Sequence, residues 1–314
     1  MGPIFHALVN AARNGHHKWL RMLLKLESNQ VNKADKHGRT LLYFAAQRGH
    51  EKVVQILLEV GDIDVNKPSK YGCSPLLVAA KYGHVKIVKM LLGREDIYVN
   101  KKDEDGKTVL MMPGLMSALW HGAALSGNEQ VVNTVRLLLD RPDFNVNQQD
   151  NNGKTVLLWA ADTGNLELVK LLLLREDINV NQADKNGITP LHTATSRANL
   201  ELVELLLGQK GIKLSKATKS GEIPLGMAME RMDFPNPNFK SIVAVILEQL
   251  VKPMDEKSTC IICFDRVPEV VLIPCGHQNL CGPCAHQWDG EKKGCPVDRI
   301  KVSGILPLDV KSDS

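Results

Sequence analysis

Small and apolar residues recur along this chain in blocks with a fixed spacing. Glycines mark that spacing, with steps of 34 residues within two runs: Gly38, Gly72 and Gly106, then Gly153, Gly187 and Gly221. Most blocks carry an alanine pair, a glycine, a leucine-rich run and a closing Val-Asn, as in Ala45-Ala46, Gly49, Ile56–Leu58 and Val65-Asn66. A unit of this size can bury its apolar face only against its neighbours, so the period predicts a solenoid.

Each block predicts two helices. Small alanines allow an inner helix to pack close to its neighbour, a glycine ends that helix, and the leucine-rich run buries one face of an outer helix. The segment Thr189-Pro190-Leu191-His192, with Asp184 and Gly187 before it, resembles the signature of the ankyrin repeat. Ser74-Pro75-Leu76-Leu77 is a looser copy, and its proline suits the first turn of a helix, where a missing N–H breaks no hydrogen bond.

This resemblance implies an all-α ankyrin solenoid of helix-turn-helix repeats over residues 1–251. Five clear repeats start near Asp35, Ser69, Asp103, Asp150 and Asp184, and degenerate caps occupy residues 4–34 and 218–251. The resemblance also implies a protein-binding surface along the turn tips and inner helices. The tip residues have mixed chemistry and predict no particular ligand: Lys36, His37, Arg39, Lys70, Tyr71, Lys102, Glu104, Asp105, Asn151, Asn152, Lys185 and Asn186.

One repeat is longer than the others. Gly106 and Gly153 are 47 residues apart, and most of the extra residues fall around 111–121, with a few near Asn133. One interpretation is a lengthened helix or bulge, which solenoids tolerate in loops. The other is that Met116, Leu119 and Trp120 form an adaptable apolar contact for a partner, as methionine-rich surfaces do.

The predicted array carries no visible catalytic group. His50 and His84 each follow a repeat glycine, which favours a role in the repeat framework over metal binding. Cys73 lies alone beside a predicted turn, which favours an incidental thiol over a nucleophile.

Composition narrows the class of protein. Apolar residues make up 44% of the chain, enough for a packed core, and the formal net charge of +4 is too small to predict a nucleic-acid partner. The longest apolar run, Ile242–Leu247, is too short to span a bilayer, and the N-terminal residues lack the layout of a signal peptide. Cysteines clustered at metal-ligand spacing fit a reducing compartment. We expect a cytoplasmic protein, with the nucleus as the alternative, and no membrane insertion.

The strongest chemical signal lies near the C-terminus. Six of the seven cysteines, one histidine and one aspartate fall within 39 residues: Cys260, Cys263, Cys275, His277, Cys281, Cys284, Cys295 and Asp298. A spacing of two residues within a pair lets two thiolates of one turn reach the same metal ion. Structural zinc sites are closed and four-coordinate, so eight ligands predict two zinc ions.

The order of these ligands resembles the RING finger, because a histidine stands fourth in the series. The resemblance implies a small α+β module over residues 260–298, a linker at 252–259 and a tail at 299–314. It implies cross-braced sites, with Cys260, Cys263, Cys281 and Cys284 on one zinc ion and Cys275, His277, Cys295 and Asp298 on the other. Asp298 departs from the commonest pattern, which ends in cysteine, but aspartate is a legitimate zinc ligand. His286 matches no ligand position. In the tail, Ile300, Val302, Ile305 and Leu306 form one strand or cover the finger.

The RING resemblance also assigns a surface for an E2 ubiquitin-conjugating enzyme. Ile262, Trp288 and Pro296 occupy its contact positions, and Arg299 occupies the position of a residue that hydrogen-bonds both E2 and ubiquitin. The sequence therefore predicts a RING-type E3 ubiquitin ligase. Its ankyrin array would recruit a protein substrate, and no covalent ubiquitin-enzyme intermediate would form. The alternative is a non-catalytic ankyrin scaffold with a structural zinc module.

Overall fold

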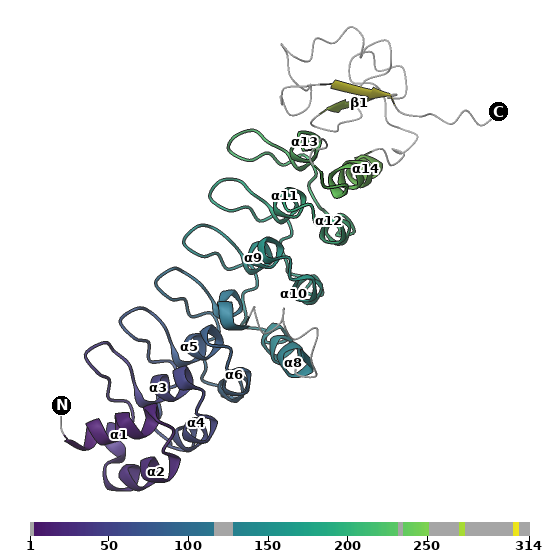
Figure 1. Ribbon diagram of the computed structural model, residues 1–314. Coiled ribbons are helices and arrows are strands. Elements are labelled where there is room, and N and C mark those ends of the chain that lie inside the picture. The colour runs from purple at the N-terminus through teal and green to yellow at the C-terminus, as the bar shows by residue number, and fades with distance from the viewer. Residues whose placement is uncertain (1–2, 116–127, 232–234, 251–269, 274–303, 308–314) are drawn as a thin grey trace. The chain divides into compact units, whose positions relative to one another are not determined.

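The computed structural model describes residues 3–115, 128–231, 235–250, 270–273 and 304–307. The chain divides into two compact units, residues 1–160 with 165–178, and residues 161–164 with 179–314. Within each unit, pairs of short helices follow one another in sequence order, and an extended turn leads into each later pair (Figure 1). The helix-turn-helix solenoid expected from the sequence is therefore confirmed for each unit.

The first unit begins with a helix pair and continues by stacking further pairs on it. Inner helices contact inner helices (α1 with α3, α3 with α5), and outer helices contact outer helices (α2 with α4, α4 with α6, α6 with α8). Its elements are α1 (Pro3–Arg13), α2 (His17–Leu26), η1 (Ser28–Gln30), α3 (Leu41–Arg48), α4 (Glu51–Leu58), α5 (Pro75–Lys81), α6 (Val85–Leu92), η2 (Val109–Met111), α8 (Asn128–Leu139) and α10 (Leu166–Leu172). The division between the units falls within α9 (Val156–Thr163).

The second unit holds two further helix pairs and a short sheet. Its inner helices α11 and α13 contact each other, as do its outer helices α12 and α14. The elements are α11 (Pro190–Ser196), α12 (Leu200–Leu207), α13 (Pro224–Met229), α14 (Asn238–Leu250), β1 (Val270–Ile273) and β2 (Gly304–Pro307). Among the described residues, no helix is both long enough and apolar enough to cross a bilayer.

The inner helices begin and end where the sequence places capping residues. The Thr40 hydroxyl accepts a hydrogen bond from Tyr43 N at 3.1 Å, and the Ser74 hydroxyl accepts one from Leu77 N at 3.3 Å. These bonds satisfy amide groups that have no partner within the first turn of a helix. Gly49 ends α3 in the left-handed region, with a φ of 75°.

The long repeat departs from its neighbours at its inner helix. After Thr108 the chain forms the single 3₁₀ turn η2, where the other repeats begin an α-helix. Met111 and Met112 are buried there, so these two methionines belong to the core. α8 has 12 residues, whereas the outer helix α6 has 8, which agrees with a lengthened helix near Asn133. Met116, Leu119 and Trp120 lie outside the described residues.

We predict that Gly49→Ala destabilises the array more than a left-handed φ alone explains. An added Cβ would lie 2.7 Å from His84 Cε1, and that ring is held by a bond from Nε2 to Gln47 O. Gly211→Ala is a matched control, because Gly211 has a φ of 78° and open space around it. We expect Gly211→Ala to cost about 1 kcal/mol and Gly49→Ala clearly more, measured by urea denaturation followed by circular dichroism. Equal costs would contradict a tight packing of His84 on Gly49.

Candidate functional site

The candidate zinc ligands all lie outside the described residues, as do Ile262, Trp288, Pro296, Arg299 and His286. What the structure does describe in this part of the chain is an antiparallel pair of strands. Val270 of β1 lies opposite Pro307 of β2, and Ile273 lies opposite Gly304. Of the two alternatives left open by the sequence, a strand or a cover for the finger, residues 305 and 306 lie in the strand β2. Residues 300 and 302 are outside the described residues.

This strand pair closes the segment that carries most of the candidate ligands. Ile273 is two residues before Cys275, and Gly304 is six residues after Asp298. Six of the eight candidates stand between β1 and β2: Cys275, His277, Cys281, Cys284, Cys295 and Asp298.

The donor set fits zinc. Six thiolates, one imidazole and one carboxylate are the side chains from which tetrahedral zinc sites are built, and soft thiolates favour zinc over magnesium or calcium. Within the described residues, no three His, Cys, Asp or Glu side chains gather as a metal site. The array's histidines therefore need another explanation.

His50 and His84 are framework residues, as the sequence predicted. His50 Nε2 lies 2.9 Å from Arg13 O, and His84 Nε2 lies 3.1 Å from Gln47 O. Each ring thus bridges from its own repeat to the inner helix of the preceding one. Cys73 is buried, and burial raises the pKa of its thiol to about 11, so it is protonated at neutral pH. Burial and protonation both favour an incidental thiol over a nucleophile at Cys73.

The turn tips form a row held together by backbone hydrogen bonds. Lys70 N donates to His37 O at 2.8 Å, and Glu104 N donates to Tyr71 O at 3.1 Å. The next tip repeats the contact, with Asn151 N donating to Asp105 O at 2.9 Å. These bonds hold the backbones of successive tips in the first unit at fixed relative positions.

Several of the tip candidates bind groups within the chain, among them Asn151, whose Nδ2 donates to Glu104 O, and Asp105, which pairs with Lys107. The Arg39 guanidinium donates to the Asp35 carboxylate through Nε at 2.9 Å and Nη2 at 2.7 Å. Lys102 Nζ donates to Gln149 O at 2.8 Å. The exposed tip residues are Lys36, Lys70, Tyr71, Glu104, Asp105, Asn151, Asn152, Lys185 and Asn186. These nine are the tip positions best placed to meet a partner.

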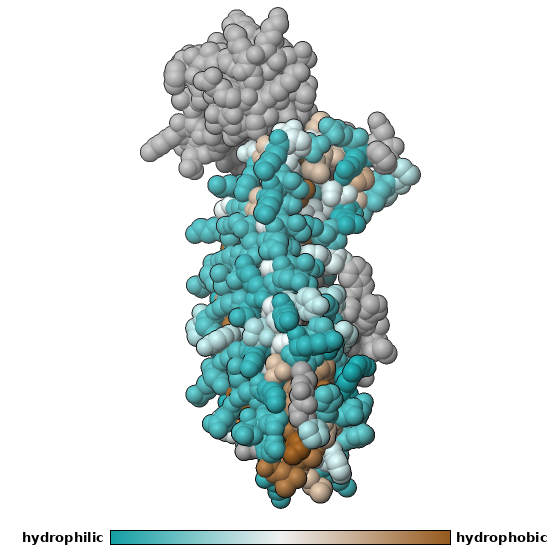
Figure 2. All heavy atoms as spheres, turned by 90° about the vertical axis from the view of Figure 1, so that its left-hand side faces the viewer, coloured by the Kyte–Doolittle hydropathy of each residue, from teal (hydrophilic) through white to brown (hydrophobic). Residues whose placement is uncertain are grey.

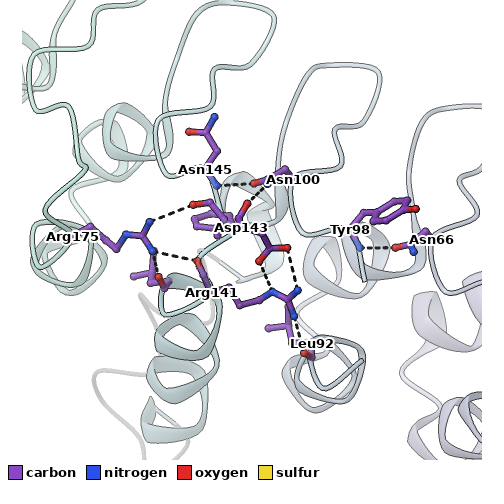
Figure 3. Close-up of polar contacts among 10 residues, drawn as sticks. Asn66, Leu92, Tyr98, Asn100, Arg141, Asp143, Asn145 and Arg175 are labelled. Carbon is purple, nitrogen blue, oxygen red and sulfur yellow. Dashed lines mark hydrogen bonds and ion pairs between the residues drawn. The ribbon is translucent and has the colours of Figure 1, made fainter. Parts of the chain in front are cut away.

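The asparagine that closes each block joins one repeat to the next (Figure 3). Asn66 Oδ1 accepts from Tyr98 N at 2.7 Å. Its Nδ2 donates to Asp96 O at 2.6 Å. Asn100 makes the equivalent pair of bonds, from Nδ2 to Asp143 O and to Oδ1 from Asn145 N. In the second unit, Asn181 Nδ2 donates to Gly211 O and its Oδ1 accepts from Lys213 N. The sequence showed that these asparagines recur at the end of the blocks, but it did not predict which groups they bind.

After the outer helices α8 and α10, Arg141 and Arg175 strengthen the same junction (Figure 3). Arg141 binds the Asp143 carboxylate through Nε at 2.9 Å and Nη2 at 3.1 Å, and its Nη1 lies 3.4 Å from Leu92 O. Leu92 is the last residue of α6, so the guanidinium reaches a carbonyl that has no partner within that helix. The hydrogen bond from Arg141 also holds the pKa of Asp143 below its ordinary value.

His192 is the fully buried histidine of the Thr-Pro-Leu-His segment. Its Nδ1 accepts a bond from Thr189 N at 3.2 Å, and its Nε2 lies 3.1 Å from Glu222 O. Because a carbonyl only accepts, Nε2 carries the proton and the ring is neutral. Burial lowers the pKa of His192, although the bond to the Glu222 carbonyl opposes the shift. Thus His192 ties the inner helix α11 to the next turn.

These features agree with comparisons against known proteins. Residues 6–69 and 116–233 match the family described as Ankyrin repeats (3 copies), and residues 71–104 match Ankyrin repeat. The first match covers more than half of the chain, so the protein belongs to the ankyrin-repeat family. Residues 256–305 match Zinc finger, C3HC4 type (RING finger), so the chain also carries a C-terminal RING-type zinc finger.

Curated relatives share short stretches with this chain. The Arabidopsis thaliana "Putative E3 ubiquitin-protein ligase XBAT34" is 38% identical over 53 residues, 17% of this chain and 14% of the relative. The Oryza sativa subsp. japonica "Probable E3 ubiquitin-protein ligase XBOS34" is 42% identical over 50 residues, 16% and 10% of the two chains. "RING finger protein 141" of Danio rerio is 36% identical over 64 residues, 20% and 28%. The matches span only 10% to 28% of these relatives' lengths.

The crystal structure of the ankyrin repeat domain of Bcl-3 is similar in fold. It has a TM-score of 0.60 and 22% sequence identity, and the match covers 76% of this chain and 97% of that chain. At this identity the likeness supports the ankyrin fold alone.

We predict that Asn66→Asp destabilises the array. The new carboxylate would still accept from Tyr98 N, but it would have no proton to donate to Asp96 O and would repel that oxygen. We expect a loss of about 1–3 kcal/mol in the free energy of unfolding at pH 7, measured by urea denaturation. Asn29→Asp is the control, because Asn29 is exposed. Similar losses in both variants would contradict a specific role for the Asn66 amide.

We predict that His192 makes the protein less stable in mild acid. The unfolded ring takes up a proton near pH 6.5, whereas the folded ring resists protonation because its pKa is lowered. The stabilisation is therefore complete above about pH 6.5 and is lost as pH falls towards the folded pKa. The thermal midpoint should drop between pH 7.5 and 5.5, and His192→Gln should drop less. The exposed His6 supplies the control, His6→Gln, which should follow the wild type. An unchanged slope in His192→Gln would exclude this explanation.

Proposed function

We propose that this protein is a RING-type E3 ubiquitin ligase whose ankyrin array recruits a protein substrate. The observation that carries the proposal is the presence of both modules on one chain: an ankyrin array, and a C3HC4-type finger at residues 256–305. The relatives named as E3 ubiquitin-protein ligases support it. Neither module alone distinguishes a ligase from an interaction protein, whereas a ligase needs a substrate-binding part and an E2-binding part.

The zinc ions would hold the finger in its folded shape. We assign Cys260, Cys263, Cys281 and Cys284 to one ion, and Cys275, His277, Cys295 and Asp298 to the other. Protein side chains would fill all four positions of each ion, so zinc would supply structure and leave no open position for a reacting water. In the sequence, the paired strands β1 and β2 stand on either side of the segment that contains all four residues assigned to the second ion.

Four residues would form the surface for E2 and ubiquitin. Ile262, Trp288 and Pro296 would make the apolar contact with E2. Arg299 follows the last ligand, and its guanidinium offers several donors in a fixed fork, which suits a side chain that must bind E2 and ubiquitin together. An apolar centre of Trp and Ile beside an arginine has the composition of an interface hot spot.

Catalysis by such a surface would be a matter of orientation. A substrate lysine amine attacks the carbonyl of the E2-linked ubiquitin thioester, the carbon–sulfur bond breaks, and the E2 cysteine leaves as a thiol while an isopeptide bond forms. The RING would restrain the flexible ubiquitin tail, which reduces the entropy lost on reaching the transition state. The finger's own cysteines would remain on zinc, and the Cys73 thiol is buried, so a covalent ubiquitin-enzyme intermediate is disfavoured.

The array would supply a rigid recognition surface. Its turn tips are joined by backbone hydrogen bonds, so binding a substrate would require little ordering of the loops. A linker at residues 252–259 is short, and a short linker raises the effective concentration of a bound substrate near a tethered enzyme. Array and finger would therefore cooperate through tethering.

The test is autoubiquitination in vitro with a panel of E2 enzymes. We expect Ile262→Ala and Arg299→Ala each to reduce the rate of ubiquitin chain formation by about tenfold or more, because each removes a central contact. Lys301→Ala, which removes the same charge two residues beyond Arg299, should retain the wild-type rate.

Zinc content, measured on the same proteins, separates two outcomes. Normal zinc in the inactive variants would assign the loss to the E2 surface. A wild-type protein with two zinc ions and no activity with any E2 would exclude the ligase and favour a non-catalytic ankyrin scaffold.

A further inference from the structure

The outer helix α2 exposes an apolar stripe at one end of the first unit. Trp19 is 53% exposed, Met22 62% and Leu26 74%. With the half-buried Leu23, these residues stand at positions i, i+3, i+4 and i+7, so they lie on one face of the helix. Large apolar side chains that are exposed together on one surface commonly mark an interaction site, so this stripe is a candidate binding surface.

The described residues of the unit leave this face uncovered. α2 buries Leu20 and Leu24 and contacts α1 and α4. Arg21 lies on the side of α2 that faces α4, because its Nη2 is 3.3 Å from the carboxylate of Glu59, the residue just past α4. Leu26 is about 140° around the helix from Arg21, so the stripe faces away from α4. Apolar residues gather at this end of the molecule, where α1 and α2 lie (Figure 2).

The surroundings of the stripe are basic. Residues 1–26 contain no Asp or Glu and four Lys or Arg residues: Arg13, Lys18, Arg21 and Lys25. Lys18 and Lys25 are exposed and lie one helical turn from Met22 on either side of it along the chain. In the described parts of the chain neither of these two lysines forms an ion pair. One edge of the stripe thus carries positive charge that has no partner.

We propose that this stripe, Trp19, Met22, Leu23 and Leu26, docks an acidic amphipathic helix of a partner protein. A helix fits because outer helices in this unit already pack side by side, α2 on α4 and α4 on α6, and α2 offers a face of the same helical periodicity. An acidic edge fits because it would neutralise Lys18 and Lys25. This binding site is separate from the tip row and goes beyond the ligase activity proposed above.

Other occupants fit less well. A second copy of this chain would bring the same excess of positive charge to the contact, which like-charge repulsion opposes. An anionic lipid surface is best met by an apolar face with basic residues on both flanks. Here the lysines lie on one flank only, and Glu27 follows the opposite one. A partner helix with one acidic edge matches this one-sided distribution.

The experiment is a selection from a displayed library of helical peptides against the full chain. Every peptide carries leucines at i, i+3, i+4 and i+7, and its polar positions are randomised among Glu, Gln and Lys. We expect peptides with glutamates along one edge to be enriched over lysine-bearing peptides. Selection of uncharged or basic helices, or of none, would overturn the proposal.

Matched variants locate the binding. Leu26→Glu should weaken the binding of a selected peptide by about tenfold or more, because it places a charge in the centre of an apolar contact. Leu174→Glu is the control, because Leu174 is also 74% exposed and lies outside the stripe. Circular dichroism verifies that both variants fold. Equal weakening by the two variants would overturn the assignment to α2.

Charge reversal tests the second half of the proposal. Lys18→Glu combined with Lys25→Glu should shift the selection from glutamate-bearing to lysine-bearing helices. Two further measurements address the rival occupants. Sedimentation with phosphatidylserine vesicles that is abolished by Leu26→Glu, or a concentration-dependent dimer abolished by the same change, would assign the stripe to lipid or to self-association and overturn the proposal. None of these readouts depends on ubiquitin transfer, so failure here and failure of the ligase proposal are distinguishable.

Discussion

The architecture of this protein depends on the junction between one repeat and the next. Helices such as α3 and α4, with 8 residues each, are too short to be stable alone in water, where about 12–15 residues are marginal. Their stability must therefore come from neighbours, and every repeat needs a complementary face on either side of it. The same requirement explains why a fixed sequence period is visible at all.

The junction between repeats has an apolar layer and a polar layer, and the two contribute to the structure in different ways. Apolar side chains such as Val53 and Leu57 supply most of the free energy, because they are fully removed from water. The polar layer fixes the register between repeats. Asn66 binds one donor and one acceptor of the next repeat's backbone, which a shift by a single residue would break. A regular row of turn tips within each unit follows from this register.

Local patterns predicted the parts of the fold that local chemistry decides. Gly38 and Gly49, read from the sequence as turn and helix-end residues, both have a φ near 75°, where glycine alone is unstrained. The spacing of the cysteines likewise predicted a zinc finger, because metal ligation demands particular side chains at particular intervals.

Local sequence patterns could not predict contacts between residues that are far apart in the chain. The partners of Asn66 lie about 30 residues further along the chain, and β1 pairs with a strand from the predicted tail. The stripe on α2 was hidden for a related reason. Leu20 and Leu26 are chemically alike in the sequence, and only the packing of α1 and α4 decides which of them is buried.

The two modules owe their folded states to different forces, which bears on how one chain can combine them. The array is held by nearest-neighbour interfaces, so a change at one junction acts chiefly on the repeats beside it. A zinc finger of this size has little core and takes its folding free energy from metal binding. On this basis the finger's fold would not depend on the composition of the array. Residues on the tips or on α2 could then vary without cost to the metal site, which the proposed pairing of a fixed ligase module with a variable recognition surface would require.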